Sequence, residues 1–285
     1  MNRLLIHVEG ETEETVVNEI LRPHLYNFGY SYVSTRLVGN ARQRDRRGGI
    51  RAWSAVRTDI INHLKEDKES LSTTMVDFYA LPQSGNRMWP GRAEASLLPF
   101  SQKAFTIETA IHADICKELG DRFDPNRFMP YVIMHEFEGL LFSDCKRFGH
   151  GIGRPDIVPQ LQKIRDQFAS PEEINDSPTS APSKRIRDLL PGYVKPLLGG
   201  LAVLEIGLET IRAECPHFRS WIERLEIWPA AHSTPVTELV PMVDNRDPLQ
   251  QHPVLRQVIM HEDPSLPLTD EDWPSSARVN DDVLP

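Results

Sequence analysis

The sequence lacks the features of a disulfide framework, a membrane span or a nucleotide-binding loop. Its 285 residues include three cysteines, Cys116, Cys145 and Cys215, an odd number without metal-ligand spacing. We therefore expect free thiols and a reducing cytosol. No apolar run approaches the roughly 20 residues of a membrane span, and the short apolar N-terminus lacks a small-residue cleavage site, so we expect no signal peptide. A GxxxxGK[ST] loop is also absent, so any ATP hydrolysis must come from another protein.

Charge is distributed unevenly along the chain. The formal net charge is -9, but from Pro229 to the end ten acidic residues face three arginines, a local charge of -7. The preceding body is close to neutral and would not repel nucleic acid. Because residues 229–285 are also proline-rich and aperiodic, we expect an acidic tail that is largely irregular and poorly ordered.

Apolar runs alternate with helical patterns in the first half of the chain. We expect strands at RLLIHV, SYVSTRLVG, TTMVDFYAL and MPYVIMHEF, and helices over about residues 12–28, 51–67 and 101–120. This alternation predicts an α/β fold with a sheet flanked by helices. The later pattern is helical, over about residues 156–169, 183–190, 200–215 and 217–227. We therefore expect an α/β core (1–145), a helical extension packed on it (146–228) and the tail (229–285).

Three of the expected strands end in carboxylates. Glu9 and, four residues later, Glu13 follow the first strand, Asp77 ends the third, and Glu136 and Glu138 end the fourth. The carboxyl ends of neighbouring parallel strands meet at one edge of a sheet. Like charges crowded there repel one another and raise their own pKa values unless a cation neutralises them. Because Mg²⁺ and Mn²⁺ prefer oxygen ligands, the pattern predicts a metal site made by these five acids.

Each of these acids also has an ordinary structural explanation. A carboxylate in the first turn of a helix stabilises it by about 0.3–1 kcal/mol through the helix dipole, which accounts for Glu13 without a metal. An Asp such as Asp77 often closes a strand. Glu136 and Glu138 share a face only if their segment stays extended; in a helix only one of them faces the site. We interpret His135 as a hydrogen-bonding residue rather than a ligand.

Five motifs together resemble domain of unknown function family 4276: VEGETEE, TMVDFYALP, PYVIMHEFEGLLF, PEEIN and APSKRI. The resemblance extends from Asn2 to Trp228 and leaves the tail outside. That family is grouped with Toprim-like folds, which include the catalytic domains of topoisomerases and primases and of overcoming-lysogenization-defect nucleases. The resemblance therefore implies a Toprim-like, Rossmannoid sheet with Mg²⁺ bound at its acidic edge.

The resemblance also implies roles for individual acids. Glu9 matches the Toprim glutamate, Glu13 the second acid of the nuclease-type motif, and Asp77 the first Asp of the Toprim DxD motif. The second DxD position is Tyr79 here, so that motif is incomplete. Glu138 is similar to a late glutamate of nuclease-type relatives and would replace the missing acid.

Two basic regions are candidates for phosphate binding. Pro182 is expected at the first position of a helix, which places Lys184 and Arg185 in the first turn, where cations oppose the helix dipole. A bound phosphate would remove this conflict; alternatively, both side chains extend into water or pair with nearby acids. The second region is an arginine-rich loop, either a solvated surface or a phosphate-tracking patch, with Arg42, Arg44, Arg46 and Arg47.

The leading functional hypothesis is a metal-dependent phosphodiesterase, a nuclease acting on DNA or RNA. Glu9, Asp77, Glu138 and Lys184 would be its catalytic residues, and Tyr79 and Trp89 would stack bases. The resemblance implies a bacterial setting, phage defence and a separate ATPase subunit. The alternative is a non-catalytic Toprim-like module that binds nucleic acid or a partner, with the tail either mimicking nucleic acid or covering the basic loop. A third hypothesis, nucleotidyl transfer, would need a triphosphate site that the sequence does not reveal.

Overall fold

A parallel β-sheet forms the centre of the computed structural model, which describes residues 1–38, 50–174 and 180–232. Its strand order is β2-β1-β3-β4, and β5 also pairs with β3; every pairing is parallel. The side chains of β3 are all buried, as expected for a parallel sheet that is covered on both faces. The strands are β1 (Asn2–Val8), β2 (Tyr30–Leu37), β3 (Ser70–Asp77), β4 (Phe128–Met129) and β5 (Val132–Ile133).

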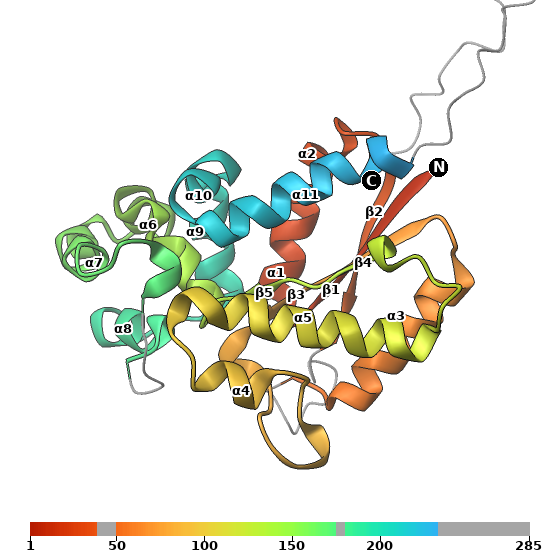
Figure 1. Ribbon diagram of the computed structural model, residues 1–285. Helices are drawn as coiled ribbons and strands as arrows, with labels where there is room; N and C mark the ends of the chain where they lie inside the picture. The colour runs from red at the N-terminus through yellow and green to blue at the C-terminus, as the bar shows by residue number, and fades with distance from the viewer. Residues whose placement is uncertain (39–49, 175–179, 233–285) are drawn as a thin grey trace, which may run out of the picture. The chain divides into compact units, whose positions relative to one another are not determined.

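Helices cover both faces of the sheet (Figure 1). On one face, α3 (Trp53–Glu66) and α5 (Phe100–Leu119) share an apolar cluster with Val76 of β3. On the other face, α1 (Glu11–Val16) and α2 (Arg22–Tyr26), joined by a π-helical turn, pack on Ile6 of β1. These elements confirm the predicted α/β class with a sheet flanked by helices.

The C-terminal part of the described chain is helical and packs in the same core as the first strand. Phe142, Trp221 and Leu225 belong to the apolar cluster that contains Leu4 and Ile6 of β1. The helices of this part are α6 (Cys145–Gly151), α7 (Val158–Arg165), α8 (Pro182–Leu189), α9 (Gly200–Ile206), α10 (Leu208–Glu214) and α11 (Pro216–His232); the short α4 (Arg92–Ser96) lies earlier in the chain. The expected acidic tail lies outside the described residues, apart from 229–232, which form the last turn of α11.

The fourth predicted strand is the element that differs most from expectation. Instead of one strand over MPYVIMHEF, the chain forms the two-residue strands β4 and β5, separated by Pro130 and Tyr131. Pro130 has no N–H to donate to a sheet. His135 then adopts φ 65°, a left-handed conformation that cannot continue a strand. The chain turns directly into a 3₁₀ helix, Phe137–Ser143.

Two other elements are interrupted as well. The third strand ends at Asp77, and Phe78–Ala80 forms a 3₁₀ turn, so Tyr79 does not lie on a strand. The helix expected over 200–215 is broken at Gly207, whose φ of 79° ends α9 before α10 begins. No helix among the described residues has both the length and the apolar character needed to cross a membrane.

Candidate functional site: a buried acidic cluster around Lys195

The first two acids of the site lie at the ends of adjacent strands: Glu9 follows β1, and Asp77 is the last residue of β3. Val8 pairs with Met75, so the ends of the two strands lie side by side. The Asp77 N–H donates to Glu9 Oε2 at 3.2 Å, and the Glu9 N–H donates to the Met75 carbonyl at 3.3 Å. Glu9 and Asp77 therefore meet at this edge of the sheet, as predicted from the carboxyl ends of neighbouring parallel strands.

Glu13 comes from the first turn of α1. Its Oε2 accepts a hydrogen bond from the Gly10 N–H at 3.0 Å, as in a capping box. An exposed residue would suffice for that capping role, but Glu13 is only 1% exposed. Burial of a capping carboxylate beside other acids is costly, and this cost indicates that Glu13 does more than begin a helix.

The left-handed turn at His135 separates the two glutamates of the HEFE segment. Glu138, 2% exposed, lies in the buried 3₁₀ helix and faces the other acids. Asp77 Oδ1 accepts the Phe137 N–H at 2.8 Å, which fixes this helix to the end of β3. Glu136 instead accepts the Ser183 N–H at 3.0 Å, at the start of α8. Glu138 thus belongs to the acidic cluster, whereas Glu136 binds the N-terminus of α8.

We predict that the two glutamates respond differently to neutralisation. Glu136→Gln should destabilise the protein by about 0.3–1 kcal/mol, the value of a carboxylate at a helix N-terminus, and leave Mn²⁺ binding within about twofold of wild type. Glu138→Gln, in the cluster, should weaken Mn²⁺ binding by more than about tenfold. Urea denaturation and Mn²⁺ titration of the two variants test this, and equal Mn²⁺ affinities would contradict the assignment.

Lys195 lies at the centre of the acidic cluster. Its Nζ is 2.9 Å from Asp77 Oδ2, 3.0 Å from Glu13 Oε1 and 3.5 Å from Glu138 Oε2. The contact with Asp77 is a hydrogen bond, whereas the contact with Glu13 is an ion pair without hydrogen-bond geometry. The side chain remains 24% exposed, so the cluster reaches solvent here. Sequence reasoning missed this residue, because VKP is an unremarkable tripeptide between two helical patterns.

The electrostatics of the cluster are those of a buried excess of negative charge. Burial raises the pKa of Asp77 well above its usual range and the pKa of Glu9 to about 7, with Lys195 opposing both shifts. Burial also raises the pKa of Glu138. For Lys195, burial alone would lower the pKa, but the four surrounding carboxylates hold it well above its usual range. One ammonium balances one of four carboxylates, so the cluster favours protons or a further cation.

The donor chemistry of the cluster fits a hard divalent cation. Four carboxylates supply the oxygen ligands that Mg²⁺ and Mn²⁺ prefer. As the side chains of the described residues stand, no three His, Cys, Asp or Glu groups are arranged to hold a metal ion, and Lys195 Nζ lies where the carboxylate oxygens converge. A cation could enter this arrangement only if Lys195 Nζ moved aside.

The predicted phosphate site at α8 already has an anion from the chain itself. Pro182 is the first residue of α8, as expected, and Lys184 and Arg185 lie in the first turn. Their backbone N–H groups bond to the Ala181 carbonyl, and the Ser183 N–H bonds to Glu136. The Arg185 Nε donates to the Ser180 carbonyl at 2.9 Å, and its guanidinium lies over the Phe168 ring. The carboxylate of Glu136 thus offsets the unfavourable charges that the sequence places in this turn.

The remaining predicted binding residues lie outside the described residues or pack against other side chains of the protein. Arg42, Arg44, Arg46 and Arg47 belong to the undescribed segment 39–49. Trp89 is completely buried, packs against Trp53 and donates to the Arg51 carbonyl, so it cannot stack on a base. Tyr79 is partly buried, with its ring stacked on His135 at 5.3 Å.

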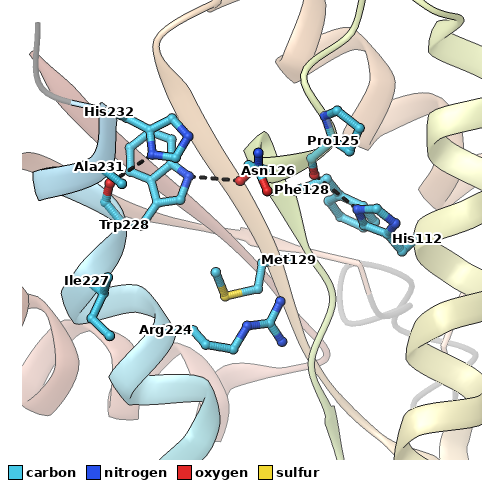
Figure 2. Close-up of a pocket in the computed structure, with 10 residues that line it drawn as sticks. All are labelled: His112, Pro125, Asn126, Phe128, Met129, Arg224, Ile227, Trp228, Ala231 and His232. Atoms are coloured by element: carbon cyan, nitrogen blue, oxygen red, sulfur yellow. Dashed lines mark hydrogen bonds between the residues drawn. The ribbon is translucent and has the colours of Figure 1, made fainter.

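A separate pocket of about 270 Å³ lies between α5, β4 and α11 (Figure 2). Its upper wall is tied together by a hydrogen bond from Trp228 Nε1 to the Asn126 carbonyl at 2.8 Å. Arg224 and Met129 line its centre. None of the four clustered carboxylates lines this pocket, so it does not serve the acidic site.

Comparison with known proteins agrees with the motifs on which this site is built. The model of the family described as Domain of unknown function (DUF4276) matches residues 8–226. No curated protein matches the chain. Among solved structures, one of the C-terminal region of the Xanthomonas campestris pv. campestris OLD protein is 15% identical, with a TM-score of 0.37; the match covers 80% of this chain and 96% of that one. A second structure of the same region has 15% identity, a TM-score of 0.35 and coverages of 81% and 98%.

The low identity and TM-scores of these structures carry no conclusion about activity. The family match, by contrast, spans most of the chain and includes Glu9, Asp77 and Glu138. It confirms the resemblance seen in the sequence motifs. The chain belongs to the DUF4276 family.

Proposed function

We propose that this protein is a metal-dependent phosphodiesterase that cleaves DNA or RNA. The observation that carries the proposal is the convergence of Glu9, Glu13, Asp77 and Glu138, three of them at most 5% exposed, around one partly exposed point of the structure. A fold that needs only a stable core gains nothing from three buried carboxylates and a fourth, partly buried one at the same point, because the arrangement is costly. A site that binds a divalent cation has a reason for it.

The four carboxylates would hold Mg²⁺ or Mn²⁺. When bound, the ion would supply Lewis-acid activation of a phosphodiester and lower the pKa of water. Backbone hydrogen bonds would orient two of these ligands. The Asp77 carboxylate accepts from the Phe137 N–H, and the Glu9 carboxylate accepts from the Asp77 N–H. In the metal-free cluster, burial raises the pKa of Glu9 to about 7, so binding of a cation near neutral pH would displace a proton from this carboxyl. Glu136, bonded to Ser183, is not a ligand in this proposal.

Lys195 takes the role that sequence reasoning gave to Lys184. Lys184 is exposed in the first turn of α8, whereas Lys195 Nζ contacts three of the four carboxylates. After moving aside for a metal, its ammonium would remain near enough to neutralise charge that develops on a phosphate oxygen. It would thus be both the counter-charge of the metal-free cluster and an electrostatic catalyst.

The substrate and partners are proposed from sequence features. The resemblance of VEGETEE and FEGLLF to nuclease-type Toprim motifs supports a nucleic-acid substrate, and the arginine-rich loop would contact its phosphates. The same resemblance supports a bacterial role in phage defence with a separate ATPase subunit. That subunit would provide the ATP hydrolysis for which this chain has no phosphate-binding loop.

The second candidate is a non-catalytic module, and Lys195 is the observation that favours it. A lysine that already contacts Asp77, Glu13 and Glu138 forms a buried ionic network that can hold a fold together without a metal. In that case the protein would bind nucleic acid or a partner through its surface. The two candidates differ in one measurable property, the affinity of the native protein for a divalent cation.

Metal binding followed by cleavage tests the proposal. We expect Mn²⁺ at a hundredfold excess over its Kd to stabilise the wild-type protein by about 2.7 kcal/mol, and Mn²⁺ or Mg²⁺ to support cleavage of end-labelled DNA or RNA. Asp77→Asn should lower the cleavage rate by more than about a hundredfold. The exposed neighbour Glu11 supplies a matched control: Glu11→Gln should stay within about twofold of wild type. If Mn²⁺ does not stabilise the wild-type protein, the non-catalytic module is the better account.

A further inference from the structure

Tyr193 is a buried residue of the acidic site that the proposed chemistry has not yet used. It lies two positions before Lys195, in the connection between α8 and the π-helical turn Lys195–Gly199. Its side chain is 6% exposed, and its backbone N–H is fixed to the Leu190 carbonyl at 3.0 Å. No group among the described residues hydrogen-bonds to its hydroxyl.

An unpaired buried hydroxyl is unfavourable, because it loses its bonds to water and gains none. The buried Tyr30 hydroxyl avoids this cost by donating a hydrogen bond to the Leu225 carbonyl at 2.8 Å. A phenylalanine at position 193 would fill the same space without the cost. The hydroxyl of Tyr193 therefore requires another explanation.

The surroundings of the hydroxyl place it beside the acidic cluster. Burial raises the pKa of Tyr193, and the negative charge of Glu138 raises it further, so the group remains a neutral donor over the working pH range. A Cβ built on Gly199 would be 2.9 Å from the hydroxyl oxygen and 3.8 Å from the Phe137 ring. The Lys195 Nζ lies 5.4 Å from the centre of that same ring. The absence of a side chain at Gly199 thus leaves room for the hydroxyl next to the cluster.

We propose that Tyr193 is a positioning residue of the metal site, whose hydroxyl donates a hydrogen bond to a water molecule held among the clustered carboxylates. This inference rests on the proposed function, since the water is placed there together with the divalent cation. The hydroxyl orients the water and contributes to the affinity for the cation, as hydrogen-bonding partners around a metal site do. Gly199 supports this role because a side chain at that position would crowd the hydroxyl.

Tyr193→Phe separates this role from a structural one, because it is expected to weaken Mn²⁺ binding without lowering the stability of the metal-free protein. The variant removes one oxygen atom and the unpaired hydroxyl, so its metal-free melting temperature should equal or exceed that of wild type. Its Kd for Mn²⁺, measured from the electron paramagnetic resonance signal of the free ion, should rise by about tenfold. A structural role would lower the melting temperature and leave the Kd unchanged.

Two further variants complete the test. Gly199→Ala keeps the hydroxyl but pushes it away, and should raise the Kd for Mn²⁺ severalfold. Tyr131→Phe is the matched control, since the Tyr131 hydroxyl is also buried without a hydrogen-bond partner among the described residues, but its ring stacks on Trp221 at 4.2 Å. It should leave the Kd unchanged.

The outcomes distinguish this inference from the proposed function. If wild type binds Mn²⁺ and Tyr193→Phe binds it within twofold, the role of Tyr193 is wrong and the metal site stands. Should wild type fail to bind Mn²⁺ at all, the metal site and the role of Tyr193 are both wrong.

Discussion

Replacing Lys195 by methionine is expected to lower the free energy of unfolding of the metal-free protein by about 3–5 kcal/mol at pH 7. The substitution keeps most of the side-chain volume but removes the ammonium that contacts Asp77, Glu13 and Glu138. Buried carboxylates that lose their counter-charge must either take up protons or remain charged without a partner, and both are costly. Urea denaturation followed by tryptophan fluorescence measures the change.

Two conditions and one control sharpen this prediction. The loss should shrink near pH 4.5, where the carboxylates bind protons, and on addition of Mn²⁺, which replaces the missing positive charge. The matched control is Lys184→Met, which removes an exposed lysine of α8 and should change stability by less than about 1 kcal/mol. Equal losses for the two lysines would contradict the central position of Lys195.

The second large effect is a pH-dependent difference in stability between wild type and Glu9→Gln. The carboxyl of Glu9 has a pKa of about 7 in the folded protein, raised mainly by burial, against an ordinary value of 4.5. The folded state therefore binds more protons than the unfolded state between these values, so wild-type stability contributed by this group falls as pH rises through them. The glutamine has no proton to lose. Without metal, Glu9→Gln should become more stable relative to wild type by on the order of 3 kcal/mol from pH 4.5 to pH 8.

The comparison with Glu9→Gln is needed because other groups titrate in the same range. Burial lowers the pKa of His7 to about 3, so this residue makes the protein more stable as pH rises towards 6.5, the opposite direction. Its contribution is common to both proteins and cancels in their difference. Saturating Mn²⁺ should reverse the difference in favour of wild type at pH 8, because ionised Glu9 is then a ligand. Parallel curves for the two metal-free proteins would show that Glu9 does not carry the proposed proton.

The parts of the site that follow strand ends were predictable from sequence. Glu9 and Asp77 directly follow apolar runs that form β1 and β3, and parallel pairing of these strands brings the two acids together. Glu138 was a candidate on the same argument. Which of Glu138 and Glu136 joins the cluster depends on the backbone of His135, which has a φ of 65°. The sequence around His135 is typical of a strand and does not predict this left-handed turn.

The basic parts of the site were not predictable in the same way. Sequence reasoning noted that the first turn of α8 carries unfavourable positive charges, which an anion would offset unless the side chains extend into water or pair with nearby acids. That anion is Glu136, a residue 47 positions earlier in the chain, rather than a bound phosphate. Lys195 and Tyr193 belong to no periodic pattern in the sequence. They lie near the acids only because the π-helical turn Lys195–Gly199 packs against α1 and against the 3₁₀ helix Phe137–Ser143. Such long-range packing leaves no local trace in the residues themselves.

The distance along the chain between Asp77 and Lys195, 118 residues, has a consequence for the order of assembly. Within the part of the chain that the structure describes, the strand pairs of the sheet form among residues that precede position 134. Loop closure over longer separations carries a greater entropic cost and comes later. During synthesis, which proceeds from the N-terminus, the carboxylates leave the ribosome well before their lysine. A nascent chain that has already paired its strands therefore holds these acids in protonated or hydrated form. The balancing positive charge of Lys195 reaches these acids only when the helical part has been made and has packed against the sheet.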